Sequence, residues 1–269
     1  RPGWHIDDTA ITEKFFGPQY DIHGGSRDLI FPHHEAEISQ MEAISEKRPM
    51  TTHWMHTGFL TIDGQKMSKS LDNFITINDS LKRYPYQNLR FLVSKNLWSS
   101  PINYSESAMI EVKSALEKIE EFLRKIRNYK SQIPNKFKWP KSKIQKLLKT
   151  AKEDFYKNLN DNFNTPKAFA VLFDFIKETN KFLEKNLVSK KQSKEIYHFF
   201  EDINSIFDII DFKKLNNTNV TKEVKKLLKE RETHRKNQDW QKSDETRKEI
   251  EKYGYLIEDT KEGSLLIKK

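Results

Sequence analysis

Lys66-Met67-Ser68-Lys69-Ser70 is the stretch of this sequence that most narrows its fold and chemistry. It places two lysines among small hydroxyl residues, just after Gly64. Such a mobile cationic loop can close on a triphosphate and neutralise the charge that develops on a leaving pyrophosphate. An exposed loop of lysine and serine has the same composition, so composition alone leaves both interpretations open.

The residues around this loop form the first of three segments. Residues 1–95 hold 6 of the 8 glycines and mix turns with short apolar runs such as Leu29-Ile30-Phe31. This alternation is typical of an α/β region. The sequence opens on Arg1-Pro2-Gly3-Trp4 without a start signal for a helix or a strand, so we expect it to enter in the middle of a domain.

From about Ser105 the apolar residues recur at steps of three and four, which predicts amphipathic helices. Four such runs are separated by short polar connections, and one of them opens on Thr165-Pro166, a cap residue followed by a proline at the first helical position. Residues 96–212 are therefore predicted to form an antiparallel helical bundle. The four runs begin near Val112, Ile144, Phe169 and Ile196.

The last segment, residues 213–269, is predicted to be a small α+β domain. An asparagine-rich linker at 215–220 precedes two expected helices, around 222–236 and 238–252. Tyr255–Asp259 and Ser264–Lys268 then flank a turn that contains Gly263, which predicts a hairpin.

Composition excludes several classes of protein. The 269 residues include no cysteine, so disulfides and thiolate metal sites within this chain are excluded. No apolar run approaches the ~18 residues that a membrane span needs, and no signal-peptide pattern opens the sequence. We therefore expect a cytoplasmic protein that does not enter a membrane. The 18 phenylalanines argue against disorder.

Net charge is +9, and the excess lies outside the first segment. Residues 1–95 carry 11 basic against 12 acidic residues, residues 96–212 carry 21 against 16, and residues 213–269 carry 16 against 11. Positive charge attracts polyanions such as RNA. A general bias toward lysine gives the same distribution, so charge alone does not identify a partner.

The five residues of the Lys66–Ser70 loop match the KMSKS signature of class I aminoacyl-tRNA synthetases. The stretches Trp4-His5-Ile6, Asp21–Gly25 and Phe31–Glu37 resemble, in order and spacing, the cysteinyl-tRNA synthetase family. The resemblance continues at Asp161–Pro166 and at the C-terminal pattern Arg231, Arg235, Asp239-Trp240, Asp244, Arg247, Gly254 and Glu258–Thr260. It implies the second half of a Rossmann-type nucleotide-binding domain in 1–95, a DALR-like tRNA-docking bundle in 96–212 and an anticodon-binding domain in 213–269.

A pair of metal-binding side chains follows from residue spacing. Pro32 begins a predicted helix, so His33 and Glu37 lie one turn apart on the same face and can share a divalent metal. A surface ion pair has the same spacing. In the family these two positions are zinc ligands together with two cysteines. Asp8 stands where one of those cysteines is expected, so the resemblance does not by itself predict bound Zn²⁺.

The resemblance also implies roles around the nucleotide. Trp4 and His23 would line the amino-acid pocket, while Asp28 would hold the ribose of ATP. Gly25 would let the backbone approach the nucleotide, and Ser26 replaces a further family glycine beside it. Lys69 would contact the transferring phosphates of Mg²⁺-bound ATP, with Lys66 as the second catalytic lysine.

In the C-terminal segment, Arg235, Asp244 and Asp259 match family positions that contact anticodon bases. Carboxylates accept from exocyclic amines, and arginine donates to guanine or phosphate. Trp240 could stack on a base or pin the two terminal helices together, and we expect pinning.

The function implied is the ATP-dependent attachment of cysteine to tRNA(Cys) through cysteinyl-adenylate. The HIGH motif of the first half of the nucleotide-binding fold is absent, so this chain alone is expected to be inactive. We expect a monomer whose partners are tRNA(Cys), cysteine and ATP. Two alternatives remain: a related ligase that joins cysteine to an amino-sugar inositol, and a non-catalytic RNA-binding relic.

Overall fold

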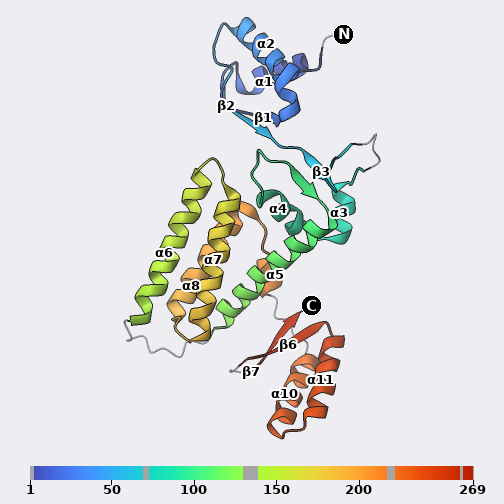
Figure 1. Cartoon of the computed structure of the whole chain (residues 1–269), viewed down its shortest axis with the longest axis vertical. Coiled ribbons are helices and arrows are strands. Elements are labelled where there is room, and N and C mark those ends of the chain that lie inside the picture. The colour runs from blue at the N-terminus through green and yellow to red at the C-terminus, as the bar shows by residue number, and fades with distance from the viewer. Residues whose placement is uncertain (1–2, 69–72, 130–138, 217–221, 261–262, 269) are drawn as a thin grey trace. The chain divides into compact units, whose positions relative to one another are not determined.

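A computed structural model describes residues 3–68, 73–129, 139–216, 222–260 and 263–268 (Figure 1). The chain divides into two compact units, residues 1–211 and 212–269. Among the described residues, no helix is both long and apolar enough to cross a membrane.

The first part of unit 1 is a parallel strand pair with its helices. Helix α1 (His5–Phe16) leads to β1 (Tyr20–Ser26), and β1 pairs in parallel with β2 (Thr51–Thr57). Parallel strands need a long crossover. Here it contains the short turns η1 (Arg27–Leu29) and η2 (Ile30–His34) and the helix α2 (Glu35–Ser45), which packs beside α1.

A second sheet follows directly. Strand β3 (Leu60–Ile62) pairs in antiparallel fashion with β4 (Gln65–Lys66), across a turn in which Gly64 has a φ of 82°. On its other edge β3 pairs in parallel with β5 (Ile102–Tyr104). Because β5 lies beyond residue 95, this sheet extends past the boundary expected from the sequence.

Two short helices connect β4 to β5. Helix α3 (Ile77–Arg83) begins after Thr76, whose side chain accepts a hydrogen bond from the Asp79 backbone amide. Helix α4 (Tyr86–Ser94) follows and buries Phe91 and Leu92. It packs against two of the long helices that come next.

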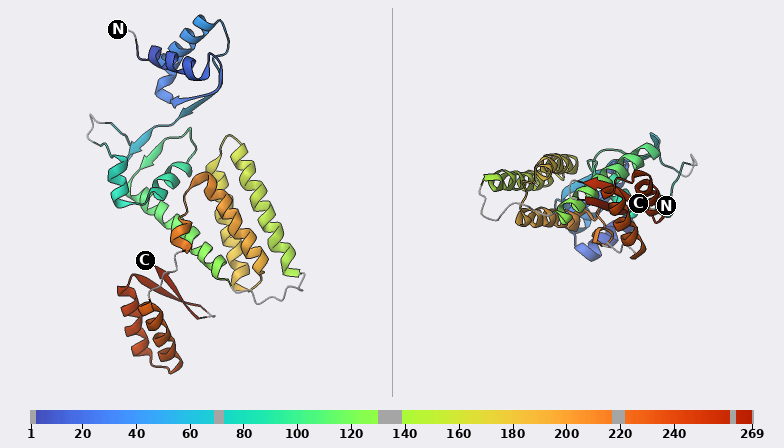
Figure 2. Two further views of the ribbon diagram at one scale, coloured as in Figure 1. Left: turned by 180° about the vertical axis from the view of Figure 1, so that it is seen from behind. Right: turned by 90° about the horizontal axis from the view of Figure 1, so that it is seen from below.

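Four long helices make up most of the rest of unit 1 (Figure 2): α5 (Glu106–Asn128), α6 (Trp139–Asn160), α7 (Thr165–Glu184) and α8 (Lys190–Phe207). Their apolar faces share a core rich in phenylalanine, including Phe122, Phe155, Phe175, Phe199 and Phe200. Helices α6, α7 and α8 reverse direction at the short connections 161–164 and 185–189 (Figure 1). No strand interrupts the described residues between 105 and 208.

Side chains cap the N-terminal ends of three of these helices. Ser105 caps α5, and Ser189 forms a full capping box with Gln192 at the start of α8. We expected Thr165 to cap the third helix, but Asn164 is the cap and its side-chain oxygen accepts from the Lys167 backbone amide. Thr165 is therefore the first residue of the helix, and Pro166 follows it within the first turn.

Unit 2 contains α9 (Phe212–Asn216), α10 (Lys222–Lys236), α11 (Trp240–Lys252) and the strands β6 (Tyr255–Thr260) and β7 (Gly263–Lys268). The strands pair in antiparallel fashion, which confirms the predicted hairpin. The buried core of unit 2 contains Val224, Ile250, Tyr255 and Ile257. The predicted linker at 215–220 lies mostly outside the described residues.

Candidate functional site

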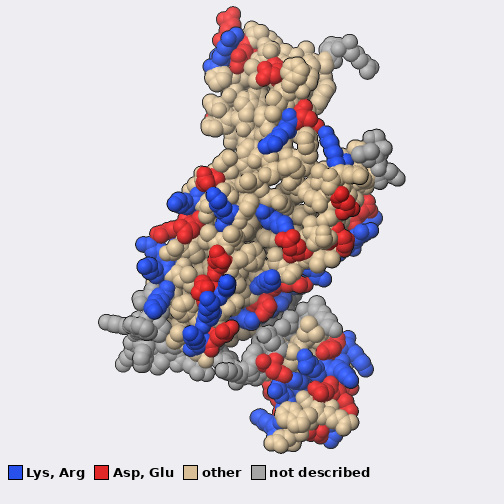
Figure 3. Space-filling view, in the orientation of Figure 1, with Lys and Arg blue, Asp and Glu red and all other residues tan. Residues whose placement is uncertain are grey.

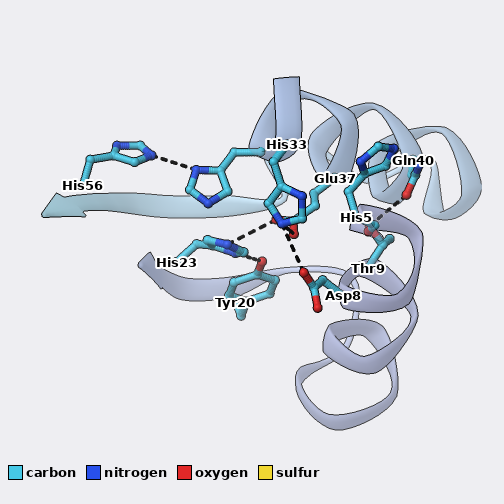
Figure 4. A network of polar contacts seen from close by, with 10 residues as sticks. His5, Asp8, Thr9, Tyr20, His23, His33, Glu37, Gln40 and His56 are labelled. Carbon is cyan, nitrogen blue, oxygen red and sulfur yellow. Dashed lines mark hydrogen bonds and ion pairs between the residues drawn. The ribbon is translucent and has the colours of Figure 1, made fainter. Parts of the chain in front are cut away.

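The predicted metal-binding pair is close together, and Asp8 joins it (Figure 4). Turn η2 runs into α2, so His33 and Glu37 share a face and His33 Nε2 lies 2.8 Å from Glu37 Oε1. Asp8, on α1, places its Oδ2 3.1 Å from the same nitrogen. The i,i+4 geometry expected from the sequence is confirmed.

This cluster offers enough ligand atoms for a divalent metal. Its nitrogen and oxygen atoms are, however, harder ligands than the sulfur of a cysteine. Potential ligand atoms of Asp8, His33 and Glu37 all lie within 4.8 Å of one another. Imidazole nitrogen and carboxylate oxygen both bind zinc, but structural zinc sites of high affinity rely on thiolates. Here a carboxylate stands in the expected thiolate position. The ring Nδ1 of His33 is also buried without a hydrogen-bond partner among the described residues.

Glu37 is the most buried acid in this region, with 2% of its surface exposed. Burial, and secondarily the negative charge of Asp8, raise the pKa of Glu37 to about 7. Its second oxygen, Oε2, faces His23 Nε2 at 3.2 Å but has no hydrogen bond from any described residue. One oxygen of this buried carboxyl group, Oε2, is therefore left without a hydrogen bond from the described residues, while Oε1 contacts His33.

His23 and Trp4, which the sequence assigned to the amino-acid pocket, border this cluster. Trp4 stacks on the His33 ring with centroids 3.9 Å apart, while 60% of its own surface stays exposed. His23, on β1, contacts Glu37, and its Nδ1 lies 2.5 Å from the Tyr20 hydroxyl. Burial, then the charge of nearby His33, lowers the pKa of His23.

Sequence reasoning missed several residues that surround this cluster. His34 Nδ1 lies 2.9 Å from His56 Nε2, and the Trp54 ring tilts against both His23 and His34. Burial lowers the pKa of His34 to about 4, so its ring is neutral near pH 7. The alternation of Trp54 and His56 along β2 puts both on one face of the strand. This spacing in the sequence is the signal that could have identified Trp54 and His56 as neighbours of the cluster.

The nucleotide-binding candidates lie at the end of β1 and at β4. Lys66 Nζ is 3.1 Å from Asp28 Oδ2 and 4.4 Å from the centre of the Phe59 ring. Hydrogen bonding from Ser26, and then from Lys66, lowers the pKa of Asp28. Lys69 lies outside the described residues.

Gly25 has a packing role that the sequence did not indicate. A Cβ at this position would lie 2.7 Å from the His34 ring, closer than real contacts allow. Gly58 is similarly constrained, because a Cβ there would lie 2.2 Å from the Ser100 backbone. Because Gly25 has no side chain, there is room for the His34 ring beside β1.

In unit 2, the carboxylate of Asp259 is fully engaged. It accepts from Arg231 Nη1 and Nη2, each at 2.8 Å, from Ser264 Oγ at 2.9 Å, and pairs with Arg235 Nη1 at 2.5 Å. A carboxylate has about four acceptor positions, so these contacts fill them. Arg231, with 3% exposure, was not predicted as a site residue.

The other C-terminal candidates face solvent. Asp244 is exposed, and the Arg235 side chain is 38% exposed. Trp240 is 60% exposed at the start of α11, so the expectation that it pins the two helices together is wrong. Its ring stays free of the core because the small apolar cluster is built from Val224, Ile250 and hairpin residues instead.

Charged side chains are unevenly distributed over the face drawn in Figure 3. Figure 3 shows Lys and Arg interspersed with Asp and Glu over the helical part and over unit 2, whereas the N-terminal α/β part is largely uncharged in this view. One groove along α6 and α8 is lined by Lys146, Lys149 and Lys152, with Glu153 and Glu195. The helical part thus offers cations that a polyanion could contact.

Comparison with known proteins shows which family these features are typical of. Three family models match in succession: "tRNA synthetases class I (C) catalytic domain" over residues 1–114, "DALR domain" over 154–211 and "Cysteinyl-tRNA ligase anticodon binding domain" over 217–264. A cysteine–tRNA ligase from Thermococcus gammatolerans is 36% identical over 98% of this chain, and one from Methanococcus maripaludis is 39% identical over 100% of it. The chain belongs to the cysteinyl-tRNA synthetase family.

This member of the cysteinyl-tRNA synthetase family spans 56% and 57% of the length of those two relatives. Among solved structures, a leucyl-tRNA synthetase from Agrobacterium radiobacter K84, in a ternary complex, resembles 65% of this chain and 24% of its own, with a TM-score of 0.51 and 16% identity. At that identity the likeness concerns the fold alone, which is that of a class I synthetase with small sheets and helical domains.

Proposed function

We propose that this chain forms part of a cysteine–tRNA ligase, which uses ATP to attach cysteine to tRNA(Cys) through cysteinyl-adenylate. The observation that carries the proposal is the 36–39% identity, over nearly the whole chain, to relatives named for that activity. Residues 1–95 would be the second half of a Rossmann-type catalytic domain. Residues 96–212 would be a tRNA-docking antiparallel bundle, and 213–269 an anticodon-binding domain.

Asp28, Lys66 and Lys69 are the proposed contacts to Mg²⁺-bound ATP. The ionised Asp28 carboxylate suits the two ribose hydroxyls as an acceptor. Lys66 now pairs with Asp28, and an arriving triphosphate would offer the ammonium stronger anionic partners. Lys69, three residues further on, would neutralise the charge that develops on pyrophosphate as it leaves. Gly25 would keep the end of β1 free of side-chain atoms beside the nucleotide.

Trp4 and His23 are proposed to line the cysteine pocket. In the family-derived position, Asp8, His33 and Glu37 would hold zinc. A zinc ion bound there would supply a soft Lewis acid that prefers the cysteine sulfur to the serine hydroxyl. Because Asp8 replaces a thiolate, we expect weak zinc binding at these three residues. The cluster would then rely on its own hydrogen bonds and on pocket size for selecting cysteine.

The two remaining domains are proposed to bind tRNA. Arg235 and Asp244 are exposed candidates for base contacts in the anticodon loop, and the exposed Trp240 ring is a candidate for stacking. Asp259, with its acceptor positions filled, is better suited to holding Arg235 in place than to contacting a base itself. The basic excess in both segments would strengthen binding to RNA.

The two alternatives are less well supported. A ligase acting on an amino-sugar inositol would not need a domain that matches the anticodon-binding family over residues 217–264. A non-catalytic relic would not need the intact Lys66–Ser70 loop. A cytoplasmic location and a monomeric state remain predictions.

The proposal is tested by Lys69→Ala in the complete synthetase that contains this chain. Cysteine-dependent exchange between ATP and pyrophosphate should fall about 100-fold or more, because an electrostatic contact to the leaving group is lost. The affinity for cysteine should barely change. Lys82→Ala, at an exposed lysine on helix α3, is the matched control and should exchange normally. An unaltered rate in Lys69→Ala would reject the assignment of this loop to the phosphates.

A further inference from the structure

A second set of potential metal ligands lies on the other side of Glu37 from Asp8. Ligand atoms of His23, His34 and Glu37 fall within 4.8 Å of one another, and they come from β1, η2 and α2. His23 Nε2 is 3.2 Å from Glu37 Oε2, whereas His33 contacts the other oxygen, Oε1. Glu37 therefore has one oxygen on each side, each facing a different group of potential ligands.

The two histidines of this set are supported in the way that metal ligands are. An imidazole that binds a metal through one nitrogen usually donates its other N–H to a partner, which fixes the ring. The Nδ1 of His23 has the Tyr20 hydroxyl at 2.5 Å, and the Nδ1 of His34 has His56 Nε2 at 2.9 Å. Both partners can accept a hydrogen bond, and both leave Nε2 as the ligand atom (Figure 4 shows Tyr20, His23 and His56).

The other set, Asp8, His33 and Glu37, occupies the positions of the family's zinc ligands and lacks this support. His33 Nδ1 is buried and has no hydrogen-bond partner in the described part of the chain. A metal on His33 Nε2 would therefore be held by a ring without an outer partner. Asp8 adds a ligand that is 42% exposed in its side chain, compared with 3% for Glu37.

The environment of Glu37 Oε2 also favours a cation. The residue is 2% exposed, and this oxygen has no hydrogen bond from the described residues. A buried acceptor without a partner is costly. An ion between Oε2 and the two Nε2 atoms would satisfy it. His34 reaches this position because Gly25 has no side chain to exclude its ring.

We propose that His23, His34 and Glu37 form a binding site for a divalent transition-metal ion such as Zn²⁺, separate from the Asp8–His33–Glu37 cluster and sharing only Glu37 with it. Two imidazole nitrogens and one carboxylate oxygen, with a further position open to another ligand, form a ligand set that zinc enzymes use. Tyr20 and His56 are positioning residues that hold the two imidazoles.

The test is zinc binding by the purified chain after its metal has been removed. Affinity is measured by calorimetry, and X-ray absorption at the zinc edge counts the imidazole ligands. Two imidazoles are expected. Tyr20→Phe removes one hydroxyl and should weaken binding about 10–100-fold, the range for lost outer partners. His34→Gln should weaken it further, while Asp8→Asn and the exposed control His53→Gln should change it little.

Several results would overturn the proposal. A single imidazole in the absorption spectrum, with binding lost in Asp8→Asn and His33→Gln but kept in Tyr20→Phe and His34→Gln, would place the ion in the family-derived position. No zinc binding by the unaltered chain would also reject it. One further result would support the proposal instead: two bound ions, of which His34→Gln removes one and Asp8→Asn the other, would show that both sites exist and share Glu37. Because Tyr20→Phe keeps the ring, it tests the site even if His34→Gln fails to fold.

Discussion

Asp259→Asn is the substitution for which the structure gives the clearest magnitude. Asp259 binds both terminal nitrogens of Arg231, and that guanidinium is 3% exposed on α10. Removing one partner of a buried ion pair costs about 3–5 kcal/mol, while exposed pairs contribute about 0–1 kcal/mol. The Asp259 side chain is 35% exposed, so water can partly solvate the arginine that remains. We expect a loss of about 2 kcal/mol for this intermediate case.

The assay is hydrogen exchange on peptides from α10 and β6, together with thermal unfolding of unit 2 within the whole chain. A loss of about 2 kcal/mol should lower the unfolding temperature of a domain of this size by about 8–16 °C. The matched control is Asp244→Asn, an exposed acid on α11, which should change stability by less than about 0.5 kcal/mol. Equal protection in the two variants would refute the assignment of Asp259 to a structural pair.

The same pair predicts a dependence on pH. Hydrogen bonding from Arg231 holds the pKa of Asp259 far below its ordinary value. A carboxylate with a lowered folded-state pKa contributes its stability above the unfolded pKa of about 4 and loses it as the pH falls toward the folded value. Unit 2 of the unaltered chain should therefore lose stability in acid below about pH 4, and Asp259→Asn should lose less.

Three further outcomes are expected. Deleting residues 213–269 from the complete synthetase should leave cysteine-dependent pyrophosphate exchange largely intact but weaken tRNA charging, and equal losses in both assays would contradict a role limited to tRNA. Arg235→Ala should weaken discrimination between cognate and altered anticodons by about 1–3 kcal/mol if it contacts a base edge, whereas equal losses on all tRNAs would indicate backbone contact. Zinc bound by Asp8, His33 and Glu37 should be removed by dialysis against a chelator, and cysteine should then be distinguished from serine less sharply than a metal–sulfur bond would allow. Stoichiometric zinc that survives dialysis with Asp8 as a ligand would contradict this.

Local patterns in the sequence predicted much of the fold. Helical periods in 105–208, the hairpin at 255–268 and the shared face of His33 and Glu37 depend on spacing along the chain, and each is present in the structure. The strand β5 was missed because three residues have no period of their own, and the pairing with β3 that stabilises it is distant in sequence.

The sequence pointed to some residues of the candidate site, such as His33 and Glu37, but not to His34, His56 or Arg231, and it did not show how these residues contact one another. The pairing of Arg231 with Asp259 spans 28 residues and depends on how the hairpin folds onto α10. Trp240 was misjudged because an aromatic residue beside a helix start does not reveal which side faces the core. The contact of His23 with Tyr20 joins two residues three apart on β1, where a regular strand alternation gives no sign of it. The contact of His34 with His56 joins η2 to β2 across 22 residues, so it depends on tertiary structure.

The most direct test of the central claim is aminoacylation of unfractionated tRNA by the complete synthetase that contains this chain, with each amino acid offered in turn. Cysteine alone should become attached, and sequencing of the charged fraction should recover tRNA(Cys). Lys69→Ala should abolish this charging while leaving tRNA binding in place. Charging with another amino acid, charging of a different tRNA, or transfer of cysteine to an amino sugar with no charged tRNA would contradict the account.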